Sequence, residues 1–145
     1  MARKISFIVA KDDFETFMKL VILATTGDAM DIEINAFFTF WGLYLLKKGK
    51  KPKVSGVPGL MSGMATGMFS KLMAKYGIED PLEMLKDAVE DGKLKLYPCS
   101  MTLDLFAEVM WPYKLLPEDL IDFAEEPVGA ATFYEMSEGG SIISL

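Results

Sequence analysis

Short apolar runs rich in β-branched and aromatic residues alternate along this chain with segments of helical periodicity. Five runs are expected to form strands: KISFIVA (4–10), DIEINAFFTF (31–40), KLKLYP (93–98), a short run at Leu120–Phe123, and SIISL (141–145). Strands separated by helices imply crossover connections and a mostly parallel sheet that is covered on both faces. The sequence therefore predicts one domain over residues 1–145, a flavodoxin-like three-layer α/β/α sandwich with about five strands.

The expected helices carry recognisable start and stop residues. Asp12 or Asp13 precedes the first helical segment, Pro81 opens a later one, and Gly92 closes it. Helical segments are expected at 14–25, 41–49, 60–77, 81–91, directly after Cys99, and at 128–139.

Charge and cysteine content narrow the class of protein. The net charge is −6, and the one basic run, KKGKKPK at residues 47–53, has the length of a solvated loop. Nucleic acid is therefore not expected as a partner, because phosphate binding requires clustered Lys and Arg. A single cysteine excludes an internal disulfide, and no apolar stretch has the length of a signal peptide or membrane span. We expect a cytoplasmic protein.

The chain contains no histidine. This absence rules out histidine-dependent acid–base relays, Ser-His-Asp triads and histidine metal sites, and one cysteine alone argues against structural zinc. The glycines of VSGVPGLMSG do not follow a strand with the spacing of a phosphate-binding loop. We expect no metal and no cofactor.

The only cysteine, Cys99, directly follows one predicted strand and precedes a helix. In an open parallel sheet, ligands bind beyond the carboxyl ends of the strands, where AKDD (10–13), FFTFWG (37–42) and YPCSMT (97–102) are expected to meet. The first turn of a helix offers unpaired N–H groups and a partial positive potential, which stabilise a thiolate or a bound persulfide. The residues alone leave two interpretations equally open, a reactive thiol or a small buried apolar residue.

Five further residues are candidate substrate-binding groups: Lys11, Thr39, Trp41, Ser100 and Thr102. The hydroxyls of Ser100 and Thr102 could donate to a sulfur anion, Lys11 could attract an anionic substrate, and the ends of the first two strands would present Thr39 and Trp41 to the same edge. The alternatives are a solvated lysine at a helix start and a core tryptophan.

The segment at 60–77 is unusually rich in methionine and glycine. Met61, Met64, Met68, Leu72 and Met73 fall on one helical face. Three interpretations are open: core, an interface within an oligomer or with a partner protein, or a membrane-surface helix. We favour the oligomer interface, because methionine suits adaptable surfaces and only Lys71 and Lys75 supply the basic face that a membrane-surface helix requires.

CSMTLDLF with its preceding apolar strand resembles the cysteine motif of the DsrE/DsrF-like family of sulfur-handling proteins. FFTFWGLYLL at 37–46 resembles a second signature, of a membrane-associated or archaeal branch of that family. The Met/Gly-rich segment and VGAATFYEM near the end also resemble this branch, in order over nearly the whole chain. The glycine that the family has after the aspartate-containing helix turn is absent, because MTLDLF runs into AEVMW.

The resemblance implies a parallel α/β/α sheet, oligomers, and sulfur relay as persulfide or thiosulfonate between carrier proteins, TusA-like or rhodanese-like. It maps the sulfur-carrying cysteine of the family onto Cys99. The leading hypothesis is therefore a sulfurtransferase-type carrier whose acceptor is another molecule, because the chain holds no second cysteine to resolve the loaded sulfur. The alternatives are a non-catalytic oligomeric assembly module of the same fold and, more weakly, a small-ligand or flavin-binding domain.

Overall fold

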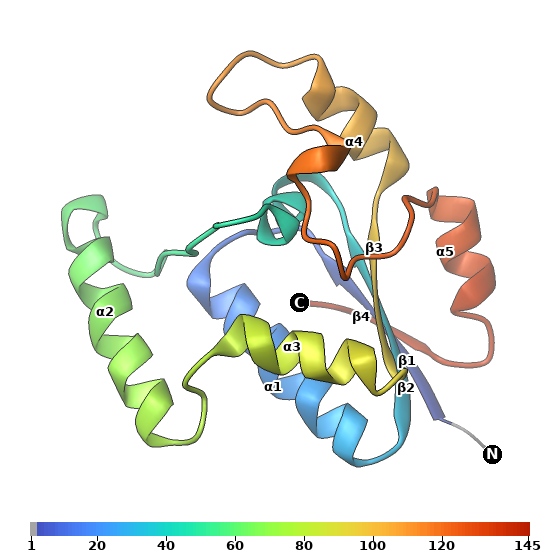
Figure 1. Cartoon of the computed structure of the whole chain (residues 1–145), viewed down its shortest axis with the longest axis horizontal. Helices are drawn as coiled ribbons and strands as arrows, with labels where there is room; N and C mark the ends of the chain where they lie inside the picture. The colour runs from blue at the N-terminus through green and yellow to red at the C-terminus, as the bar shows by residue number, and fades with distance from the viewer. Residues whose placement is uncertain (1–2) are drawn as a thin grey trace.

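The computed structural model describes residues 3–145 as a parallel sheet with helices on both faces (Figure 1). Its strands are β1 (Arg3–Val9), β2 (Ile32–Phe38), β3 (Leu94–Pro98) and β4 (Ser141–Ser144). They lie in the order β3-β2-β1-β4, and each pair is parallel. The predicted α/β class and parallel sheet are confirmed. The single-domain prediction, which includes Met1 and Ala2 outside the described residues, stays a prediction.

The helices and helical turns fill the connections between strands. They are α1 (Phe14–Ala29), η1 (Phe40–Leu46), α2 (Gly59–Lys75), α3 (Pro81–Glu90), α4 (Ser100–Ala107), η2 (Pro117–Asp119) and α5 (Ala130–Met136). Asp13 caps α1, since its side chain accepts a hydrogen bond from the Thr16 N–H at 2.9 Å. The helix expected at 41–49 is a 3₁₀ helix that begins one residue earlier.

Strand alternation divides the buried residues between the two faces of the sheet. Phe7 and Val9 of β1 belong to the main core with α1 and α3, whereas Ile8 packs with a smaller cluster beneath α5. Gly42 follows β2, and its Cα approaches the backbone of Val9 so closely that a Cβ there would overlap the Val9 carbonyl. This close approach holds η1 against the carboxyl edge of the sheet.

The expected strand at Leu120–Phe123 is wrong. Leu120 makes only an isolated antiparallel bridge to Lys47, directly after η2, and Ile121 is buried in the main core. This run is apolar because its side chains pack into the main core near η1, not because it joins the sheet. The sheet has four strands among the described residues, and its β3 edge is covered instead by residues 125–128.

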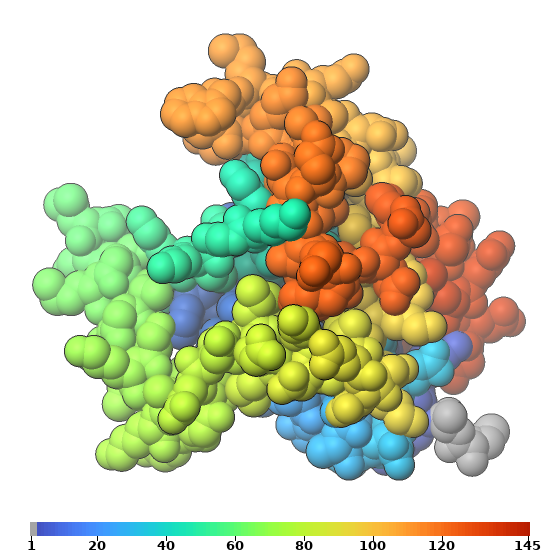
Figure 2. Space-filling view, in the orientation of Figure 1, coloured from blue at the N-terminus to red at the C-terminus, as the bar shows by residue number. Residues whose placement is uncertain are grey.

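Helix α2 lies apart from the rest of the domain (Figure 1). Ser62 is its only buried residue, although Ala65 and Met73 pack partly against the core. Figure 2 shows α2 (green) at one margin of the molecule, beside a hollow in which the N-terminal part of the chain (blue) is visible. Within residues 3–145, no helix combines the length and apolar character needed to cross a membrane.

Candidate functional site

The backbone of Cys99 joins β3 to α4 at the carboxyl edge of the sheet. Its N–H donates to the Phe38 carbonyl at 2.9 Å, which extends the pairing of β2 and β3 by one residue. Its carbonyl accepts the Leu103 N–H at 3.0 Å and so starts α4, for which Cys99 is the N-cap residue. The cysteine thus occupies the expected strand-to-helix junction.

The side chain of Cys99 lies on the α5 face of the sheet. Leu94 and Leu96 point to the main core, so Tyr97 and Cys99 alternate to the opposite face. There Cys99 packs with Phe37 and Phe133, whose rings stack at a centroid distance of 4.7 Å. Cys99 is only 7% exposed. Among the described residues its sulfur has no hydrogen-bond partner and does not cap α4, so in this conformation the thiol sits in an apolar niche.

Residues 125–128 cover Cys99 along the free edge of β3. The Glu125 N–H donates to the Leu96 carbonyl at 2.7 Å, and the Val128 N–H donates to the Pro98 carbonyl at 3.0 Å. In return, the Ser100 N–H donates to the Val128 carbonyl at 2.9 Å. We call residues 125–128 the cover segment. These three backbone hydrogen bonds hold the cover segment beside β3 and the start of α4, and the partly buried Val128 side chain packs against the Cys99 cluster.

Thr39 and Thr102 lie together and join two elements. Their hydroxyl oxygens are 3.1 Å apart, and the Thr102 hydroxyl oxygen also accepts the Phe40 N–H at 3.1 Å. This link fixes the end of β2 to α4, and it commits the Thr102 hydroxyl to the backbone of η1. Ser100 lies beside Gly129, the N-cap residue of α5, which directly follows the cover segment.

Trp41 belongs to an aromatic group on the other side of α4. Its ring stacks on Tyr44 at 5.7 Å and approaches Phe106 and Tyr113 at 5.8 and 6.1 Å. Trp41 and Tyr113 line an open hollow of about 250 Å³ that Cys99 does not line. Lys11 is exposed. The structure therefore joins Thr39 with Thr102, and Ser100 with the Cys99 cover, but Trp41 stands in a separate environment.

Two tyrosines near these groups remain protonated at neutral pH. Burial, followed by the Glu125 and Glu33 carboxylates, raises the pKa of Tyr97 above its usual value. Burial likewise raises the pKa of Tyr44, with smaller contributions from Asp12 and Tyr113. Neither hydroxyl supplies a base at the sheet edge. Over residues 3–145, no three His, Cys, Asp or Glu side chains gather as metal ligands.

The residues that enclose Cys99 are not among those predicted from the sequence. Phe37, Val128 and Phe133 form most of its surroundings. The alternation Leu94–Leu96 carried a usable signal, because it assigns Cys99 to the face opposite the main core. No local pattern indicates that Phe133, which lies 34 positions further along the chain, packs on that face.

The fold and the site define a class: parallel α/β proteins with a single cysteine at a strand-to-helix junction. The chain matches the model of the DsrE/DsrF/DrsH-like family over residues 1–59 and 56–143, and it belongs to this family. The predicted family is thereby confirmed.

Two curated relatives match almost end to end. The chain is 31% identical to the sulfur carrier protein DsrE2 of Allochromatium vinosum, over 99% of this chain and 97% of the relative. It is 28% identical to the uncharacterized protein YrkE of Bacillus subtilis, over 97% and 94%. A role in the sulfur-relay family follows from this relationship.

Proposed function

We propose that this protein carries a sulfane sulfur or thiosulfonate on Cys99 and relays it to the thiol of a partner protein. The observation that carries the proposal is the position of its single thiol, at the β3–α4 junction, in a chain similar throughout to a sulfur carrier protein. Because the chain has no second cysteine, the thiol that accepts the sulfur must belong to another molecule, as expected for a carrier.

Loading and unloading are two thiolate displacements. The Cys99 thiolate attacks the terminal sulfur of a donor persulfide, forms a Cys99 persulfide, and releases the donor thiolate. With tetrathionate, attack on a central sulfur leaves a Cys99–S–S–SO₃⁻ adduct and releases thiosulfate. An acceptor thiolate then attacks the carried sulfur, and the Cys99 thiolate leaves.

Both displacements require the cover segment to open. The Cys99 residue is only 7% exposed, which leaves a donor protein little access to its thiol. Three backbone hydrogen bonds and one partly buried valine are a small barrier to local opening. Opening next to Gly129 also frees the Ser100 N–H from Val128, which adds a donor at the start of α4. The opened junction is then the electropositive niche expected for a sulfur anion.

The partners we propose are TusA-like or rhodanese-like carrier proteins, in the cytoplasm, and the carrier itself is proposed to form a homo-oligomer. Thr39 and Thr102 act in this account as positioning residues, since their link fixes α4. Lys11 and Trp41 face other surroundings and are proposed to contact a docked partner, not the sulfur.

A second candidate is a non-catalytic assembly module of the same fold. The burial of Cys99 favours it, as does the exposure of large apolar side chains along α2, such as Leu60, Met64 and Met68. It predicts oligomerisation or partner capture that survives Cys99→Ser.

Sulfur loading separates the two candidates. The protein is incubated with a small persulfide or with tetrathionate, and its intact mass is measured beside that of Cys99→Ser. The carrier hypothesis predicts one adduct per chain on the natural protein and none on the variant. No adduct at either protein, or the same adduct at both, excludes the carrier and leaves the assembly module.

A further inference from the structure

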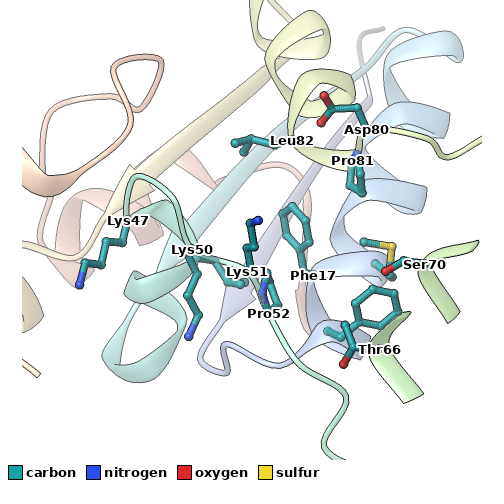
Figure 3. Close-up of a pocket in the computed structure, with 13 residues that line it drawn as sticks. Phe17, Lys47, Lys50, Lys51, Pro52, Thr66, Ser70, Asp80, Pro81 and Leu82 are labelled. Carbon is teal, nitrogen blue, oxygen red and sulfur yellow. The ribbon is translucent and has the colours of Figure 1, made fainter. Parts of the chain in front are cut away.

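A hollow on the opposite side of the sheet from Cys99 combines an apolar floor with a cationic rim (Figure 3). Its volume is about 370 Å³, and it opens between α1, α2, the start of α3 and the loop that follows η1. Phe14, Phe17, Met18 and Leu45 form the floor, and none of them is more than 8% exposed. A concave, mainly apolar space of this size with a few polar groups is typical of small-molecule sites.

Lysines gather along one side of this hollow. Lys47, Lys50 and Lys51 line it, and they belong to a seven-residue stretch with five of the fifteen cationic side chains in an acidic chain. Lys50 pairs with Asp12 at 2.9 Å, whereas Lys47 and Lys51 have no carboxylate within 4.0 Å among the described residues. In Figure 3 the Lys51 side chain extends toward Phe17 and Leu82. The ammonium group of Lys51 beside the buried Phe17 ring, with Lys47 at the margin of the hollow, favours an anion that carries an apolar part.

The remaining polar groups are separated from the lysines. Asp80 lies near Pro81 and Leu82, across the hollow from Lys47 (Figure 3), and its carboxylate accepts the Glu83 N–H at the start of α3. The Thr66 hydroxyl already accepts the Val54 N–H and donates to Ser62. Ser70, on the α2 side, is exposed, and its hydroxyl has no hydrogen-bond partner among residues 3–145. The negative head of a ligand is thus directed to the lysines, and its apolar part to the floor.

A second hollow, on the other side of Phe14 and Met18, is the reason to expect that a bound ligand would restrict the movement of α2. Its volume is about 420 Å³, and Phe69 and Met73 of α2 line it. Helix α2 is therefore bordered by open space on both sides, and its polar side-chain contacts with the rest of the chain are those of Ser62 and Thr66 with the Val54 backbone, among the described residues. An apolar chain laid over Phe14 would fill space that α2 does not reach.

We propose that this hollow binds an anionic amphiphile, an aliphatic chain that ends in a carboxylate, sulfate or phosphate. The site shares no lining residue with the Cys99 cluster, so the proposal does not depend on sulfur transfer. Free fatty acids and anionic lipid headgroups supply the same chemistry, and the experiment separates these two sources.

Binding of decanoate, decyl sulfate, decanol and decyltrimethylammonium to the whole protein is measured by calorimetry below their micelle concentrations. The two anions are expected to bind at least about tenfold more tightly than the neutral and cationic probes, which corresponds to about 1.4 kcal/mol. Lys47→Gln combined with Lys51→Gln is expected to remove this preference. Lys48→Gln is the matched control, because Lys48 belongs to the same run but bonds to the Glu118 carbonyl and does not line the hollow.

Ser70→Phe tests the location, since the new ring on the exposed face of α2 fills the hollow without disturbing the buried floor. Decanoate affinity is expected to fall at least about fivefold, and decanoate is expected to slow trypsin cleavage at Lys71 and Lys75 in the natural protein only. Binding of the protein to phosphatidylglycerol vesicles is measured without and with free decanoate. Binding that is lost when decanoate is added would identify a lipid headgroup as the source of the anion. Absence of decanoate binding, equal affinity for decanol, or affinity unchanged by Ser70→Phe would overturn the proposal.

Discussion

The two faces of the sheet differ in how much they bury and in how firmly they are held. The face toward α1 and α3 belongs to the large core, in which Val9, Leu94 and Leu96 are completely buried. The face toward α5 has one small buried cluster, made of Phe37, Cys99 and Phe133. We therefore expect the face toward α1 and α3 to contribute most of the stability of the domain, whereas the candidate sulfur site lies beside the smaller cluster, where fewer contacts must break for a local opening.

The largest expected effect is the loss of a core aromatic. Phe38→Ala removes a side chain that is 1% exposed on the α1 face, and the free energy of unfolding should fall by about 3–5 kcal/mol. Urea unfolding followed by circular dichroism measures it. Phe133→Ala, which truncates the buried ring of the small cluster on the α5 face, is the comparison and is expected to cost less. Equal losses at the two positions would break the distinction between the faces.

Val128→Ala tests how firmly the face toward α5 is held. It removes apolar contacts between the cover segment and the Cys99 cluster, which lowers the cost of opening by about 1.4 kcal/mol. Alkylation of Cys99 by iodoacetamide should accelerate about tenfold. Val109→Ala is the matched control, because Val109 packs on the main core. An unchanged rate at Val128→Ala would show that Cys99 is reached by another route.

Thr102→Val tests the link between β2 and α4. The nearly isosteric change removes the acceptor of the Phe40 N–H and the partner of the Thr39 hydroxyl, so a cost of about 1–2 kcal/mol is expected in urea unfolding. Thr132→Val changes an exposed threonine of α5 and should leave the stability unchanged. A Thr102→Val protein as stable as its parent would remove Thr102 from the set of positioning residues.

The smallest effect concerns the cap of α1 and depends on pH. Partial burial acts to raise the pKa of Asp13, but hydrogen bonds from Thr16 and Ser55 outweigh it and hold the pKa below its usual value. A carboxyl with a lowered folded-state pKa stabilises above its unfolded pKa, and this contribution disappears as the pH falls through the folded value. Asp13→Ala should therefore cost about 1 kcal/mol at pH 7 and less in acid.

Thermal unfolding of Asp13→Ala between pH 7 and pH 3 measures this dependence. Asp122→Ala, at an exposed position outside the caps, serves as the control. A difference that stays constant down to the lowest pH would mean that the carboxylate charge does not act at this cap.

Local sequence signals predicted the elements that they mark directly. The alternation of apolar runs identified β1, β2, β3 and β4, and Pro81 and Gly92 framed α3. The prediction of a strand at Leu120 was wrong because a short apolar run in a loop that packs into the core has the same composition as a strand. The cover segment, with Glu125, Glu126 and Pro127, has no strand pattern, yet its backbone pairs with β3.

The candidate site was predictable in position but not in enclosure. That Cys99 lies at the carboxyl edge follows from the strand before it, and its face follows from the alternation of Leu94 and Leu96. Its burial depends on Phe133 and Val128, which reach it only through the tertiary fold. Trp41 was expected at the same edge; it packs with Tyr44, Phe106 and Tyr113 and does not belong to the Cys99 cluster.

Transfer of sulfur from Cys99 to a second thiol is the most direct measurement. The protein is loaded with isotopically heavy sulfur, freed of donor, and mixed with a single-cysteine acceptor protein, and both masses are followed over time. The account predicts that the heavy sulfur leaves Cys99 and appears on the acceptor in equal amount, faster in Val128→Ala. A protein that never takes up the label, or one that holds it without passing it on, would contradict the account.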